Sequence, residues 1–172
     1  AFMAASLALA VTPGPGVLYI VTRSLSQGRT AGFASVAGMA VGNAVNATVA
    51  ALGLAAVLAT SALLYTVIKY LGAAYLFHLA YQMLRRADAP VAPVAHAASQ
   101  PMKVFRDGVI VGVLNPKTAL FFAALLPQFV DTPADFTRQA LMLGALFVVI
   151  AGVSDSLYVV LSRSIAGRLG GM

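Results

Sequence analysis

Two long stretches without any charged residue dominate this sequence. No Asp, Glu, Lys or Arg occurs from Ala1 to Thr22 or from Thr30 to Ile68. A run of about 20 apolar residues is enough for a helix to cross the hydrocarbon core of a bilayer, and such runs are rare in water-soluble domains. A soluble core of this length could not bury so much apolar sequence. The chain is therefore predicted to be an all-α, polytopic membrane protein.

The overall composition supports a membrane protein and argues against several other classes. The chain is 60% hydrophobic and 9% charged, whereas soluble domains carry roughly 25% charged residues. It has no cysteine, its five acids are all Asp, and its only imidazoles are His78 and His96. With so few ligands and no Ser/His/Asp set, we expect no metal site, no cofactor and no enzyme activity.

The apolar sequence divides into five predicted membrane spans separated by short polar loops. These are about Ala1–Val21, Gly32–Leu58, Leu63–Leu84, Gly108–Val130 and Gln139–Leu161. We expect the chain to begin partway into its first helix, because no polar flank or initiator Met precedes it. A sixth span is expected from the repeat described below and is missing from these residues.

The distribution of basic residues predicts the orientation in the membrane. Eight of the eleven Lys and Arg residues fall in odd-numbered loops: Arg23, Arg29, Arg85, Arg86, Lys103, Arg106, Arg163 and Arg168. By the positive-inside rule these loops are cytoplasmic. The net charge of +6 is thus explained by topology, and the expected partner is the lipid bilayer, not nucleic acid.

The sequence divides into two similar halves around a Pro- and Ala-rich cytoplasmic linker at 87–104. Residues 1–86 form the first predicted repeat and residues 105–172 an incomplete second one, each opening with a span that contains a Pro break. With Arg29 aligned on Arg138, Asn46 falls opposite Asp155, since each lies seventeen residues further on. Three spans per half make the two repeats run in opposite directions through the membrane.

The first span is interrupted by Pro13, Gly14 and Pro15. Neither proline has a backbone N–H, and glycine adds backbone freedom, so the helix should unwind here. Unpaired main-chain groups are tolerated in a membrane only where they are buried in protein or line a cavity. We therefore expect these residues to bind substrate, although a plain structural kink is the alternative.

The fourth span carries a second interruption, at Asn115, Pro116 and Lys117. Asn is a natural N-cap and Pro suits the first helical position, so a half-helix is predicted to begin here. Lys117 lies eleven residues beyond Arg106, roughly 16 Å along a helix and close to mid-bilayer depth. A buried charge in a membrane indicates a functional site.

The predicted partner of Lys117 is Asp155, which is also the predicted proton-coupling residue. Asp155 lies eight residues before Arg163, roughly 12 Å from the cytoplasmic end of its span. The two charges should therefore lie at similar depths. They would form either a functional pair or a structural ion pair that fixes helix packing.

Polar and small residues in the second span suggest further roles. Asn43 and Asn46 lie three residues apart, which favours hydrogen bonds between helices. Because of its depth, Asn46 is also a candidate substrate-binding residue. Gly38 and Gly42 form a small-xxx-small pattern that favours close helix packing and would permit a homodimer.

A set of motifs in a fixed order covers most of the chain. They are TPGPGVL at Thr12–Leu18, GRTAG at Gly28–Gly32, GMAVG at Gly38–Gly42, KYLGAAYL at Lys69–Leu76, NPKTALFF at Asn115–Phe122 and LPQFV at Leu126–Val130. Together they resemble the LysE/RhtB family of bacterial amino-acid exporters. The resemblance implies a small transporter of the bacterial inner membrane that moves amino acids out of the cytoplasm by using the proton gradient.

The sequence departs from the family pattern at several positions. Members usually have Asn where this chain has Gly16, often have His at the position of Asn46, and often have Gly at that of Ala80. Two other functions remain open: an exporter of divalent cations or another small solute, and a non-transporting membrane scaffold. A cation exporter would need several acids or imidazoles within the membrane, where only Asp155 is expected.

Overall fold

The computed structural model describes residues 1–61, 100–130 and 135–169, together with scattered positions between Leu63 and Tyr81. Throughout this described part the regular secondary structure is helical, which confirms the predicted all-α class. Most of the predicted third span, most of the linker at 87–104, and Lys69 lie outside the described residues.

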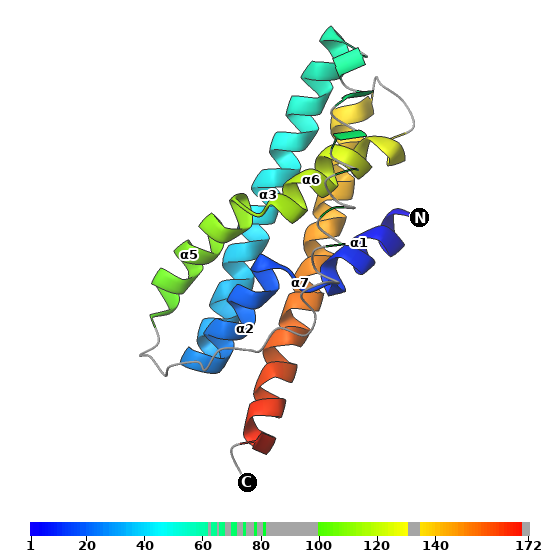
Figure 1. Ribbon diagram of the computed structural model, residues 1–172. Coiled ribbons are helices and arrows are strands. Elements are labelled where there is room, and N and C mark those ends of the chain that lie inside the picture. The colour runs from blue at the N-terminus through cyan, green and yellow to red at the C-terminus, as the bar shows by residue number, and fades with distance from the viewer. Residues whose placement is uncertain are drawn as a thin grey trace.

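The described residues form two long unbroken helices and two broken ones. In chain order they are α1 (Phe2–Val11), α2 (Pro15–Gln27), α3 (Arg29–Thr60), α5 (Pro101–Val113), α6 (Pro116–Leu125), the short 3-10 helix η1 (Leu126–Phe129) and α7 (Phe136–Leu169). Figure 1 shows α3 and α7 running through the height of the molecule, with the shorter helices packed beside them. Gly28 connects α2 to α3 at a φ of 88°, a backbone conformation that favours glycine.

Both long helices have the length and composition of membrane spans. Segments Arg29–Val57 of α3 and Phe136–Ser162 of α7 are apolar enough to cross a bilayer. Both also present large apolar side chains outward; Val49 and Val149, for example, keep 64% and 63% of their surface exposed. In a bilayer these faces contact acyl chains, so their exposure carries no hydrophobic penalty.

The other two described spans are broken where the prolines predicted. Helices α1 and α2 meet at an angle of 48°, and α5 meets the α6–η1 segment at 42°. The helices extend beyond the predicted spans, because α2 continues to Gln27 and α5 already begins at Pro101. The charges near these ends are accommodated within the helices, where Arg23 of α2 pairs with Asp107 of α5 at 3.1 Å.

Close packing of α3 against α5 depends on two pairs of glycines. A Cβ atom on Gly38 would lie 2.3 Å from the carbonyl oxygen of Phe105, and one on Gly42 would lie 2.6 Å from the Cα of Gly112. Gly108 of α5 faces Gly38 in the same way. The predicted packing role is therefore confirmed. Because the glycine face is covered within the chain, it is not a free surface for a homodimer.

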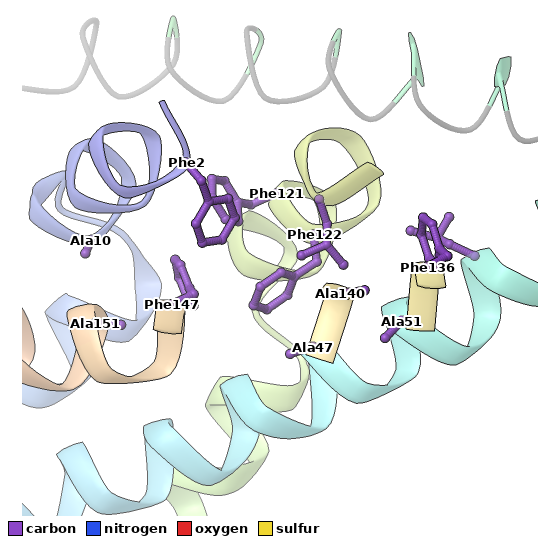
Figure 2. Packing of buried hydrophobic residues seen from close by; sticks show 12 residues of the cluster. Phe2, Ala10, Ala47, Ala51, Phe121, Phe122, Phe136, Ala140, Phe147 and Ala151 are labelled. Carbon is purple, nitrogen blue, oxygen red and sulfur yellow. The ribbon is translucent and has the colours of Figure 1, made fainter. Parts of the chain in front are cut away.

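An aromatic cluster forms the larger core, where α1, α6 and α7 meet. Phe121 and Phe122 of α6 are fully buried, and their ring centroids lie 5.1 Å and 5.0 Å from that of Phe147 on α7. Phe2 of α1 packs on Phe121 at 6.1 Å and on Phe129 at 5.3 Å. Figure 2 shows Phe2 and Phe147 directed toward the α6 rings. We call Phe2, Phe121, Phe122, Phe129 and Phe147 the aromatic cluster.

Candidate functional site

The two helix breaks have the local geometry that their sequences predicted. Thr12 and Gly14 are extended, and α2 begins at Pro15. In the second break, Asn115 is the N-cap of α6, and its side-chain oxygen accepts a hydrogen bond from the backbone N–H of Lys117 at 3.2 Å. Pro116 occupies the first helical position, where its missing N–H costs nothing.

The carbonyl groups freed at the end of α1 are paired with side chains from other helices. The Lys117 ammonium donates a hydrogen bond to the carbonyl oxygen of Thr12. The Tyr158 hydroxyl of α7 donates to the carbonyl oxygen of Val11 at 2.6 Å. The end of α1 is therefore tied to both α6 and α7, and a positive charge lies at the negative end of its helix dipole.

A small cavity lies where the two breaks converge. Its volume is about 30 Å³, which is on the scale of one or two water molecules. Residues of α1, α2, α3, α6 and α7 line it, and the polar or glycine members are Gly14, Gly16, Asn43, Asn115, Lys117, Thr118 and Asp155. Met39 also lines the cavity, and its methyl group fills the space beside Gly16, 2.4 Å from where a Cβ would be.

The predicted site residues divide between the cavity and its surroundings. Gly14, Asn115, Lys117 and Asp155 line the cavity. The prolines at 13, 15 and 116 are exposed on the outer side of the breaks, where they shape the backbone without lining the cavity. Asn46 lies elsewhere, because its side-chain amide donates to the carbonyl oxygen of Gly112 at 2.9 Å. It therefore joins α3 to α5.

Lys117 and Asp155 share the cavity but do not form a contact pair. Each keeps only 7% of its surface exposed. The ion pairs within 4.0 Å among the described residues are Arg23–Asp107 and Arg138–Asp135, so Asp155 and Lys117 are further apart than that. The two charged residues therefore line one cavity, without a direct salt bridge between them.

Sequence reasoning assigned Asn43 only to helix packing, and it passed over a polar cluster between α2 and α5. Asn43 is 3% exposed, and its Oδ1 atom has no hydrogen-bond partner.

Between α2 and α5, Arg23 pairs with Asp107 and lies over the ring of Tyr19 at 5.3 Å. The Tyr19 hydroxyl donates to the carbonyl of Val104 at 2.8 Å. We call Tyr19, Arg23 and Asp107 the polar clasp. The sequence signal for the polar clasp was Asp107, an acidic residue next to Arg106.

Comparison with known proteins gives several relatives that match most of the chain. A homoserine/homoserine lactone efflux protein of Salmonella typhimurium is 30% identical over 99% of this chain and 83% of its own length. A leucine efflux protein of Salmonella choleraesuis is 27% identical over 79% of this chain and 65% of its own length. A membrane protein of Vibrio cholerae is 33% identical, with coverages of 89% and 75%.

No solved structure matches the chain. The family model described as LysE type translocator matches residues 7–169, and both helix breaks and all the cavity-lining residues lie within that range. On this match and the 30% identity to a homoserine/homoserine lactone efflux protein, the chain belongs to the LysE type translocator family.

Proposed function

We propose that this protein is a secondary transporter that exports amino acids from the cytoplasm by proton antiport, with the substrate bound between the broken pairs α1–α2 and α5–α6. Relatives named for the efflux of homoserine, homoserine lactone and leucine support this class of substrate. The observation that carries the proposal is the cavity at the convergence of both breaks, which holds a buried cation and a buried carboxylate. The protein would lie in the bacterial inner membrane with its odd-numbered loops in the cytoplasm.

The start of α2 offers a place for the substrate carboxylate. Gly16 and Val17 line the cavity and belong to the first turn of α2, where backbone N–H groups have no partner within their own helix. The positive end of the helix dipole adds to their attraction for an anion. Because Pro15 has no N–H, the neighbouring amides of Gly16 and Val17 are the donors that remain.

Asp155 is the residue that we propose for proton coupling. Among the described residues lining the cavity it is the one acid, and it lies deep in α7, away from either end. Binding a proton there would neutralise a charge that is costly to bury. A cation exporter is less well supported, because no group of three or more His, Cys, Asp or Glu side chains is found in the described part of the chain.

Alternating access requires a barrier on each side of the site, and the structure offers two candidates. The aromatic cluster lies on the side of α1 and α6, whereas the polar clasp joins α2 to α5. With odd-numbered loops in the cytoplasm, the clasp is the inner barrier and the aromatic cluster the outer one. The cavity has room for only one or two water molecules, so it must widen to admit an amino acid. Rotation of the half-helices about their breaks would open one side at a time.

The test is efflux from proteoliposomes loaded with labelled L-leucine or L-homoserine, followed by a screen of the other common amino acids. With the protein oriented as proposed, acidifying the outer medium should accelerate efflux, and an ionophore that collapses the gradient should remove the acceleration. The Asp155→Asn variant should lose the response to the gradient. If no amino acid moves faster than in protein-free vesicles, the transporter proposal is wrong and the scaffold alternative stands.

A further inference from the structure

The main-chain acceptors freed at the first break are already occupied. Lys117 donates to the carbonyl of Thr12, and Tyr158 donates to that of Val11. The carbonyls of Ala8 and Leu9 accept from the backbone of Thr12. An unwound helix end is often an acceptor site for cations in transporters. Here most of these oxygens are engaged, so a substrate's amino group needs other acceptors.

Two side chains in the cavity supply acceptors that have no partner. Asp155 of α7 is 93% buried, and its carboxylate neither accepts a hydrogen bond nor forms an ion pair within the described structure. Asn43 of α3 is 97% buried, and its Oδ1 atom is likewise unpaired. A buried acceptor without a donor is costly, and native proteins contain few of them. The Asn43 oxygen is such an acceptor, and the Asp155 carboxylate lines the same cavity, so a hydrogen-bond donor bound there could reach both.

We propose that Asp155 and Asn43 bind the α-ammonium group of the substrate, and that this contact contributes more to recognition than any contact with the substrate carboxylate. The inference rests on the proposed function and specifies which end of the amino acid the side chains hold. An ammonium group has three donors and a positive charge, which match one carboxylate and one amide oxygen.

The position of Lys117 is consistent with this assignment. Its ammonium is engaged by the carbonyl of Thr12, and it lies more than 4.0 Å from the Asp155 carboxylate. Gly14 allows the lysine side chain to lie against the break, since a Cβ there would be 3.1 Å from the lysine Cδ atom. Lys117 is therefore held on the α1 side of the cavity, and Asp155 stays available to a second cation.

Binding of leucine analogues to the purified protein tests the inference without requiring transport. L-leucinamide keeps the ammonium and lacks the carboxylate, whereas N-acetyl-L-leucine keeps the carboxylate and lacks the ammonium. Ligands that bind the folded state raise its melting temperature. We expect L-leucine and L-leucinamide to stabilise the protein, with N-acetyl-L-leucine binding at least about tenfold more weakly than the amide. Equal or tighter binding of the N-acetyl compound overturns the inference.

Two asparagine variants on the same helix provide the matched comparison. Asn43→Ala removes an acceptor from the cavity and should weaken L-leucinamide binding at least about tenfold, as expected for one hydrogen bond to a charged group. Asn46→Ala removes a bond to the Gly112 carbonyl outside the cavity and should leave binding unchanged within twofold. Equal losses in both variants would contradict the assignment.

The two proposals can fail separately. If efflux is driven by the gradient but N-acetyl-L-leucine binds more tightly than L-leucinamide, only the ammonium assignment is overturned. Binding of leucine and its amide in the expected order without gradient-driven movement overturns proton-coupled export and leaves the ammonium site in place.

Discussion

Replacing Gly42 by alanine adds a single methyl group at the closest approach of α3 and α5. The new Cβ would lie 2.6 Å from the Cα of Gly112 and 2.7 Å from the backbone nitrogen of Val113. Carbon atoms at optimal separation are about 3.5–4.0 Å apart. Both contacts are with main-chain atoms, which cannot move aside as a flexible side chain can, so the two helices must separate by about 1 Å.

The magnitude follows from two opposing effects. Alanine favours a helix over glycine by up to about 1 kcal/mol, whereas forcing extra volume into a packed interface costs about 1–3 kcal/mol. The net expectation for Gly42→Ala is a loss of about 1–2 kcal/mol in the free energy of unfolding. Gly53 lies on the same helix with nothing within 4 Å of its Cβ position. Gly53→Ala should therefore be neutral or stabilising by up to about 1 kcal/mol.

Thermal unfolding of the detergent-purified variants measures the difference between these two identical chemical changes. For a domain of this size, 1 kcal/mol shifts the melting temperature by about 2–4 °C. We expect Gly42→Ala to melt several degrees below Gly53→Ala and to transport more slowly, because α3 also carries Asn43 into the cavity. Equal melting temperatures for the two variants would refute the claim that glycine contacts set the distance between α3 and α5.

Two further changes test the proposed barriers. Arg23→Asp or Asp107→Arg alone places like charges opposite each other, so leakage of preloaded amino acid without a pH gradient should rise about fivefold, equivalent to about 1 kcal/mol. The double exchange should restore the original leakage rate. A double variant that leaks as fast as the single ones would contradict the polar clasp. Phe121→Ala removes a fully buried ring and should lower the free energy of unfolding by about 3–5 kcal/mol. Phe33→Ala changes a residue that is 44% exposed and should lower the melting temperature much less. Similar losses in the two variants would argue against the aromatic cluster as a core.

The features that depend on local chemistry could be predicted from the sequence. Both helix breaks follow from proline and glycine, and the restart of α6 at Asn115 follows from the preference of Asn for N-caps and of Pro for the next position. The polytopic helical class follows from the uncharged runs. Neither the described residues nor the comparisons test the orientation, the inverted repeat or the third span, so these stay predictions.

The features that depend on how helices face one another could not be predicted. Asn43 and Asn46 have the same residue type and nearly the same depth, and only the packing of α3 on α5 directs one into the cavity and the other to the Gly112 carbonyl. Similarly, depth matched Lys117 with Asp155, but the carbonyl of Thr12 competes successfully for the lysine. A backbone acceptor of this kind has no signature in the sequence.

Whether Asp155 belongs to a structural ion pair or to a binding site can be decided from stability alone. Breaking a buried ion pair by removing one partner destabilises a protein by about 3–5 kcal/mol, because the other charge is left uncompensated. Asp155 has no contact partner within the described helices, and Lys117 already has the Thr12 carbonyl. The Asp155→Asn change therefore breaks no salt bridge, and Lys117 keeps its bond to the Thr12 carbonyl, so the melting temperature should change by no more than a few degrees while transport is lost. A fall of about 6 °C or more, the least that a broken pair predicts, would mean that Asp155 serves to hold the helices together.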